Sequence, residues 1–293
     1  LKLRPVVRKA LIMGGMWLIS LGTLWGQCTA TLTSDPETDA QTVCVNTAIT
    51  DITYTTNATA ASFINLPTGI SGYISGNQIT ITGTPTTNGQ FNYIINLSGV
   101  CGTATVPGTI TVNPVLSVAV AVSASANPVC AGTSVTFTAN PENEGNTPSY
   151  QWQVNGVNAG TNSPTYSYTP ADGDEVTVIL TSSETCASGS PATSNQVTMT
   201  VDPLLPVSVS IAASANPVCV GTSVTFTATP VNEGNTPSYQ WQVNGVNAGT
   251  NSPTYSYTPA NGDEVTVILT SSETCASGSP ATSNQVTMTV DPL

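Results

Sequence analysis

The strongest constraint on the fold is an internal duplication. Residues 127–204 recur without gaps as residues 216–293, at an offset of 89 residues. The two copies differ at four positions, Ala131/Val220, Asn140/Thr229, Glu142/Val231 and Asp172/Asn261. Looser similarity upstream extends each unit to about 89 residues, the size of one small β-sandwich. A single active site needs no copies, so the duplication favours roles in which length or copy number matters.

The repeated unit shows the period-two alternation of β-strands. In SVTFTA, Val135 and Phe137 share one face, and in YQWQV, Tyr150 and Trp152 do the same. TYSY, EVTVIL and QVTMTV follow the same pattern, and no stretch after the first 25 residues has a convincing helical period. The Asn155–Gly156 pair between two short strands predicts a type I′ hairpin turn. These features predict two packed antiparallel sheets in each repeat.

The first segment, residues 1–27, has the pattern of a cleaved signal peptide. Four basic residues precede the apolar run ALIMGGMWLISLGTLW. A membrane anchor is the alternative, but this run is short for a span of about 20 residues. The four basic residues are Lys2, Arg4, Arg8 and Lys9.

Three β domains are predicted after the signal peptide. Residues 28–114 form a distinct unit of strands and turns, residues 115–204 the first repeat and residues 205–293 the second. The junctions TVNPVLSV and TVDPLLPV are short and contain proline, which restricts bending. We therefore expect a semi-rigid rod of three sandwiches.

The repeats resemble the immunoglobulin-like (Ig-like) repeats of large secreted surface proteins of Bacteroidota-type bacteria. The resemblance rests on NPVCAGTSVTFTA, YQWQVNG, GDEVTVILTSSETC and NQVTMTV, and it covers each repeat. The first domain, with LPTGI and ITGTPTTNG, resembles PKD-like and Ig-like repeats of the same proteins. The resemblance implies tandem Ig-like sandwiches in a longer array, with Trp152 and Trp241 as buried core aromatics.

Charge excludes several classes of function. Every basic residue lies within the first nine positions, while the chain carries 16 Asp and Glu and no His. Nucleic acids and anionic membrane surfaces attract basic side chains, so we expect the mature chain to bind neither. Acid–base catalysis would have to rely on carboxylates, Tyr or Cys. We predict no catalytic residues, no cofactor and no enzymatic activity.

One acidic turn is a candidate cation site. The ADGDE turn brings together Asp172, Asp174 and Glu175, a composition that suits calcium. The second copy replaces one carboxylate with Asn261, which favours a solvated turn instead. We therefore predict no metal site.

The cysteines indicate disulfides, since a signal peptide implies an oxidising compartment. Separations of 56 and 57 residues favour one bond per domain, with Cys28 unpaired or intermolecular. The predicted pairs are Cys44–Cys101, Cys130–Cys186 and Cys219–Cys275.

An interdomain arrangement is the alternative. Cys130 precedes one predicted strand and Cys186 follows another, and these points tend towards opposite ends of a sandwich. The alternative pairs are Cys130–Cys275, Cys44–Cys186 and Cys28–Cys101, with Cys219 left for a following domain.

These observations favour a non-enzymatic protein of the bacterial cell surface that acts as an adhesin or a structural stalk. Its partners would be an extracellular protein or glycan, or copies of itself. The alternatives are a filament subunit assembled by β-strand exchange, and a carbohydrate-binding accessory module of a larger secreted protein.

Overall fold

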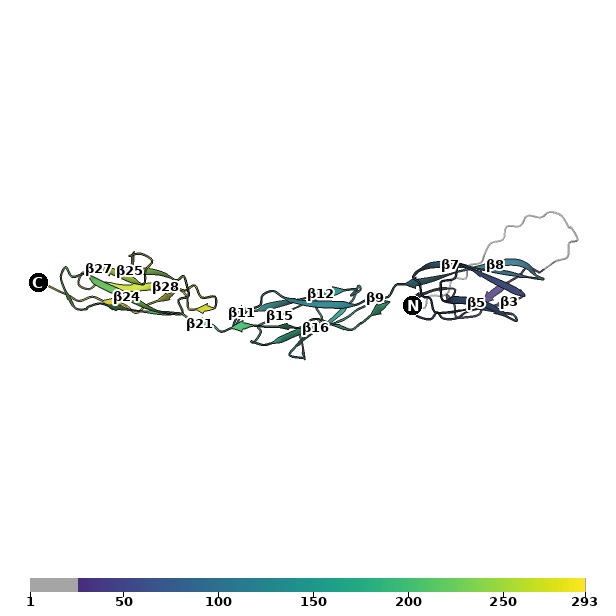
Figure 1. Ribbon diagram of the computed structural model, residues 1–293, viewed down its shortest axis with the longest axis horizontal. Coiled ribbons are helices and arrows are strands. Elements are labelled where there is room, and N and C mark those ends of the chain that lie inside the picture. Colours follow the sequence, from purple (N-terminus) through teal and green to yellow (C-terminus); the bar gives the residue numbers. More distant parts are fainter. Residues whose placement is uncertain (1–25, 293) are drawn as a thin grey trace, which may run out of the picture. The chain divides into compact units, whose positions relative to one another are not determined.

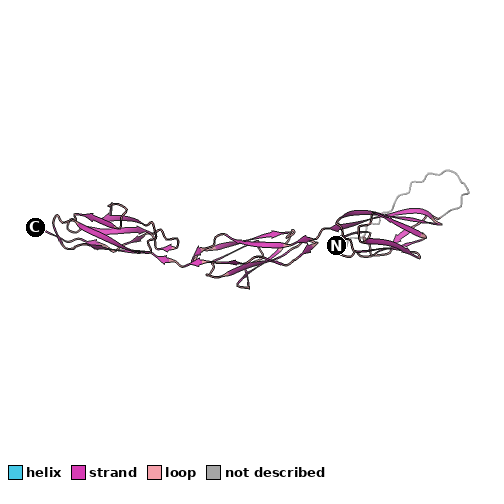
Figure 2. Cartoon of the chain, in the orientation of Figure 1, coloured by secondary structure: helices cyan, strands magenta, loops and turns pink. Residues whose placement is uncertain are grey.

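The computed structural model describes residues 26–292, and every regular element in that range is a β-strand (Figures 1 and 2). The all-β prediction is therefore confirmed. The predicted signal peptide lies outside the described residues except for its last two positions. No helix within residues 26–292 has the length and apolar composition needed to cross a membrane. The chain divides into two compact units, Leu1–Val115 and Leu116–Leu293, and the second unit holds both repeats.

The first unit is a sandwich of two four-stranded sheets. One sheet has the order β1–β3–β6–β5 and the other has the order β2–β8–β7–β4. β2 pairs with β8 in parallel, and the remaining neighbours are antiparallel. The strands are β1 (Ala30–Leu32), β2 (Ala40–Cys44), β3 (Ile52–Thr56), β4 (Ala60–Ile64), β5 (Ile70–Ser75), β6 (Gln78–Gly83), β7 (Gly89–Gly99) and β8 (Gly102–Asn113).

Two tyrosines sit in the core of this unit among isoleucines. Tyr93 is fully buried in β7 directly opposite Gly108 of β8, and a Cβ on Gly108 would lie 2.2 Å from the Tyr93 ring. Glycine at that position therefore makes room for the ring. The hydroxyls of Tyr93 and Tyr54 are 3.4 Å apart, and burial raises the pKa of both phenols.

Each repeat forms an Ig-like sandwich with its own core. In repeat 1 one sheet has the order β10–β12–β15 and the other β14–β13–β16–β18, with β19 also on β16. These strands are β10 (Ala119–Ala124), β12 (Val135–Glu142), β13 (Ser149–Val154), β14 (Val157–Ala159), β15 (Thr165–Tyr168), β16 (Glu175–Thr181), β18 (Ala192–Thr193) and β19 (Val197–Thr198).

Repeat 2 reproduces this topology strand for strand, with sheets β22–β24–β27 and β26–β25–β28–β30, and β31 on β28. The strands are β22 (Ser208–Ala213), β24 (Val224–Val231), β25 (Ser238–Val243), β26 (Val246–Ala248), β27 (Thr254–Tyr257), β28 (Glu264–Thr270), β30 (Ala281–Thr282) and β31 (Val286–Thr287).

The predicted strand faces are confirmed in both sheets of repeat 1. Val176, Val178 and Leu180 of β16 are fully buried, and so is Phe137 on the facing sheet. The alternation therefore directs one side of each strand into a common core.

The predicted hairpin turn is also confirmed. Asn155 and Gly156 connect β13 and β14 with positive φ angles of 53° and 75°, as a type I′ turn requires.

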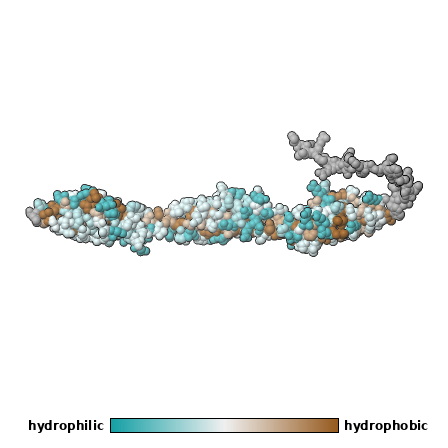
Figure 3. Space-filling view, turned by 90° about the horizontal axis from the view of Figure 1, so that it is seen from above, coloured by the Kyte–Doolittle hydropathy of each residue, from teal (hydrophilic) through white to brown (hydrophobic). Residues whose placement is uncertain are grey.

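Apolar surface is broken into small patches among neutral and hydrophilic side chains on the face shown in Figure 3. The exposed apolar side chains of the described residues include Val157, Val220 and Val246. Scattered apolar residues of this kind are normal on soluble surfaces and mark no binding site by themselves.

Candidate functional site

The two cysteines of repeat 1 lie next to different short strands. Cys130 ends β11 (Val129–Cys130), which pairs in parallel with β20 (Val201–Asp202). Cys186 directly precedes β17 (Ala187–Ser188), which pairs in parallel with β9 (Leu116–Ser117) at the start of the repeat.

A disulfide joins the two repeats. Cys130 of repeat 1 bonds to Cys275 of repeat 2, across a Cα–Cα distance of 5.4 Å and a sequence separation of 145 residues. The Cys130 sulfur lies 3.5 Å from the carbonyl oxygen of Thr274. The junction between the repeats is therefore covalently braced as well as linked by the chain.

The remaining cysteines complete a pattern that corrects the prediction of one bond per domain. Cys28 bonds to Cys101 inside the first unit, with a Cα–Cα distance of 4.8 Å, so Cys28 is not unpaired. Cys219 is an exposed free thiol rather than the partner of Cys275. Cys44 and Cys186 are also disulfide-bonded.

Strand length explains why Cys130 does not pair with Cys186. The Cys130 end of the sandwich lies beside the start of β16, because the Val201 amide donates to the Asp172 carboxylate at 2.9 Å. Cys186 follows the other end of this seven-residue strand. Seven residues span about 23 Å in a strand, whereas a disulfide needs Cα atoms within about 7 Å.

The same reasoning applies to Cys44 and Cys101 in the first unit. Cys44 lies opposite Asn113 at the end of β8, whereas Cys101 directly precedes the start of that strand. Twelve residues of β8 place these two ends about 40 Å apart. Cys28 lies at the Cys101 end and takes the bond instead.

The acidic turn is a hydrogen-bonded element of the fold. The Asp174 carboxylate accepts hydrogen bonds from Asn155 Nδ2 at 2.8 Å, the Ala171 amide at 2.9 Å and the Tyr168 hydroxyl at 3.2 Å. The bond from Asn155 is the main cause that lowers the pKa of Asp174. Burial, together with the neighbouring Asp174 charge, raises the pKa of the Tyr168 phenol.

The two repeats differ at this turn, with Asp172 in the first and Asn261 in the second, but both side chains accept the same hydrogen bond. The Asp172 Oδ1 atom accepts from the Val201 amide at 2.9 Å, and Asn261 Oδ1 accepts from the Val290 amide at 3.0 Å. An amide oxygen replaces a carboxylate oxygen without loss, so this position does not require a charge. Within residues 26–292 there is no group of three or more His, Cys, Asp or Glu that could hold a metal ion.

Trp152 and Trp241 are fully buried. The Trp152 Nε1 donates to the Ser163 carbonyl at 2.9 Å, and Trp241 Nε1 donates to the Ser252 carbonyl at 2.9 Å. Their rings are therefore part of the two cores and are not available to stack against a ligand.

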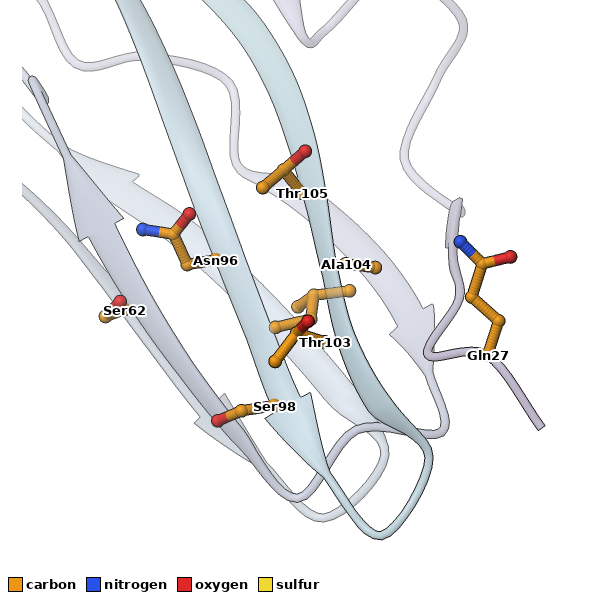
Figure 4. Close-up of a pocket in the computed structure, with 8 residues that line it drawn as sticks. Gln27, Ser62, Asn96, Ser98, Thr103, Ala104 and Thr105 are labelled. Atoms are coloured by element: carbon orange, nitrogen blue, oxygen red, sulfur yellow. The ribbon is translucent and has the colours of Figure 1, made fainter. Parts of the chain in front are cut away.

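The first unit has an open polar hollow of about 630 Å³ (Figure 4). Ser62, Asn96 and Thr105 lie opposite one another across β4, β7 and β8. The complete lining is Gln27, Ser62, Asn96, Leu97, Ser98, Thr103, Ala104 and Thr105. Hydroxyls and amides can form hydrogen bonds with a polar molecule, but none of these side chains ionises near neutral pH.

Two asparagines make side-chain hydrogen bonds that the sequence does not predict. The sequence predicts Asn155 as a turn residue, and its Oδ1 also accepts from the Glu175 amide at 2.9 Å. The Asn195 side chain bonds to both backbone groups of Val122, at 2.9 Å and 3.2 Å. No local motif signals the second contact, because its partners are 73 residues apart.

Comparison with known proteins identifies similar folds only. No protein-family model matches the chain, and no curated protein sequence matches it. Solved structures with a similar fold include the full ectodomain (Ig1–Ig3) of mouse nectin-like molecule 4, at 13% identity, a TM-score of 0.36, and coverage of 86% of this chain and 96% of that chain. The titin I-band fragment I67–I69 matches at 9% identity, a TM-score of 0.35, and coverage of 87% and 95%. The ICAM-5 D1–D4 ectodomain fragment matches at 10% identity, a TM-score of 0.35, and coverage of 90% and 77%.

Proposed function

We propose that this chain is a non-enzymatic extracellular protein of the bacterial cell surface, acting as an adhesin or a structural stalk. The observation that carries the proposal is the Cys130–Cys275 disulfide between two near-identical Ig-like repeats. Disulfides of this kind persist in oxidising compartments outside the cytosol. A bond that braces a junction between repeats serves spacing and projection, and it has no evident use in catalysis.

The polar groups of the repeats support a structural role. Asp174 and its counterpart Asp263 are both engaged by an asparagine, a tyrosine and a backbone amide. A general acid or base needs an oxygen or proton that is accessible to the substrate, and a pKa near the working pH. These carboxylates have lowered pKa values and satisfied oxygens, which suits a fixed turn.

The ligand of an adhesin would be an extracellular protein or a glycan. The polar hollow of the first unit is the best candidate contact surface, since its hydroxyls and amides match the hydrogen-bonding groups of sugars. The repeats would then act as the spacer that holds this unit away from the cell, as part of a longer array.

The two alternative functions have less support. The segment after Cys28 forms β1, which already pairs with β3, and Cys28 is bonded to Cys101. Strand exchange with a neighbour would have to break that pairing. A carbohydrate-binding module commonly offers several exposed stacking aromatics, whereas Trp152 and Trp241 of the repeats are buried and Tyr73 of the first unit is the one large aromatic among the described residues that is mostly exposed.

The mass and shape of residues 27–293 without reductant test the proposal. We expect light scattering to give the mass of a monomer, and negative-stain microscopy to show three beads in a row. Fibres or a ladder of oligomers would overturn the stalk proposal in favour of a filament subunit. The Cys28→Ser variant would then show whether release of that segment promotes assembly.

A further inference from the structure

Cys219 holds in repeat 2 the position that Cys130 holds in repeat 1. It ends β23 (Val218–Cys219), which pairs in parallel with β32 (Val290–Asp291). This is the same pairing that β11 and β20 make around Cys130. The strand pair that carries the bonded cysteine is therefore present a second time.

The hydrogen bonds next to the two cysteines are the same. The Val220 amide donates to the Asp291 carbonyl at 3.0 Å, where the Ala131 amide donates to the Asp202 carbonyl at 2.8 Å. The only sequence difference at this place is Ala131/Val220, and the Val220 side chain is 53% exposed. Nothing in the local backbone distinguishes the free thiol from the bonded one.

Cys275, on the other side of the disulfide junction, also lies next to a pair of short strands of its repeat. Cys275 precedes β29 (Ala276–Ser277), which pairs in parallel with β21 (Leu205–Pro206), and the Leu205 amide donates to the Cys275 carbonyl at 2.8 Å. A hollow of about 290 Å³ lies at this junction. Its lining residues are Asp202, Pro203, Leu205, Glu273, Thr274 and Cys275.

Repeat 1 has a cysteine, Cys186, in the same structural setting as Cys275 of repeat 2. The Leu116 amide donates to the Cys186 carbonyl at 2.9 Å, and Cys186 is buried to a similar extent as Cys275. Each repeat thus has a cysteine in each of the two structural settings that the Cys130–Cys275 bond joins.

We propose that Cys219, together with β23 and β32, is the first half of another disulfide junction, and that its partner is a further Ig-like repeat with a cysteine at the position of Cys275. The described residues do not supply this partner. Cys28 is bonded to Cys101, and Cys130 is bonded to Cys275. Cys44 and Cys186 are also disulfide-bonded. The proposal concerns how repeats join, and it holds for an adhesin and a stalk alike.

The chemistry of the bond balances with a small disulfide as oxidant. One Sγ–Sγ bond forms between Cys219 and the partner cysteine, and two thiol protons and two electrons leave. Oxidised glutathione accepts them as its own S–S bond breaks, giving two molecules of reduced glutathione.

An extended chain tests the proposal. Residues 27–293 are followed directly by a second copy of residues 205–293, and that appended copy carries Cys219→Ser and Thr274→Ser. The first change removes the next unpaired thiol, and the second labels the peptide that contains the appended copy of Cys275. The protein is refolded in reduced and oxidised glutathione, denatured, and treated with a maleimide to count free thiols by mass.

We expect no free thiol in the extended chain, and a pepsin peptide that joins Cys219 to the labelled cysteine. A monomer on a non-reducing gel would place the partner repeat in the same polypeptide, and a covalent dimer would place it on a second molecule. Two free thiols, or pairing of the labelled cysteine with any residue other than Cys219, would overturn the proposal.

Two control proteins calibrate the measurement. The unextended chain retains one free thiol at Cys219. An extended chain that also carries Cys219→Ser in its original repeat retains one free thiol in the appended copy. Each control should keep the Cys130–Cys275 peptide, which shows that the existing junction has formed.

Discussion

Repeats 1 and 2 have equivalent strands, buried side chains at equivalent positions and almost the same sequence, yet the first cysteine of each is in a different covalent state. Cys130 is bonded to Cys275, and Cys219 is an exposed thiol. The hydrogen bonds on either side of the two cysteines match. The comparison shows that the local fold alone does not decide whether this cysteine is bonded, because that fold is the same in both places.

The largest expected effect comes from removing a core tryptophan in one repeat at a time. Trp152→Ala and Trp241→Ala should each lower the free energy of unfolding of their own repeat by about 3–5 kcal/mol, since each ring is fully buried. Residues 27–293 contain no other tryptophan, so during urea unfolding the fluorescence of each variant reports on the unchanged repeat, while circular dichroism also follows the mutated one. If the unchanged repeat loses as much stability as the mutated one, the two repeats unfold as one cooperative unit.

The second-largest effect distinguishes the bonded Cys130 from the free Cys219. Cys130→Ser should lower the free energy of unfolding by about 2–4 kcal/mol, because it opens a long covalent loop. Cys219→Ser should change it by less than about 0.5 kcal/mol, as for other exposed sites. Urea titration without reductant measures both. Equal losses in the two variants would show that Cys219 has a structural role inside repeat 2.

Acid should weaken both repeats in parallel. Hydrogen bonds hold the pKa of Asp174 and Asp263 below the ordinary aspartate value, so each contributes stability that is present above about pH 4. That contribution is lost as pH falls through the lowered pKa of the folded state. Unfolding midpoints measured between pH 6 and pH 2.5 should therefore fall in both repeats. The Asp174→Asn variant should have a shallower fall in repeat 1 alone, at a cost of about 1 kcal/mol at neutral pH.

The smallest effect is expected from a substitution that gives repeat 1 the residue found in repeat 2. Asp172→Asn should change the free energy of unfolding by less than about 0.5 kcal/mol, because the amide oxygen can still accept from the Val201 amide as Asn261 does from Val290. Asp172→Ala is the matched control, and it should cost more because it removes the acceptor. A large loss in Asp172→Asn would indicate that the charge itself is used in repeat 1.

The strands could be predicted from the sequence, because period-two alternation records directly which side chains face the core. The disulfides could not be assigned by spacing. A repeat places every equivalent cysteine at the same separation, so bonds within a repeat and bonds to the next repeat leave the same numerical pattern. The lengths of β16 and β8 decide the pairing, because they place Cys130 far from Cys186 and Cys44 far from Cys101. The Cys28–Cys101 pair, in turn, depends on β1 returning to pair with β3, a contact with no local signature.

The bond between Cys130 and Cys275 also determines how the chain would respond to mechanical tension. A pull applied before Cys130 and after Cys275 passes through the sulfur atoms and bypasses the 145-residue separation between them. At about 3.5 Å per extended residue, roughly 500 Å of contour length cannot be drawn out even if both sandwiches unfold. Only the first strands of repeat 1 and the last strands of repeat 2 lie outside this closed loop, so the pair of repeats behaves as a nearly inextensible link until the disulfide is reduced.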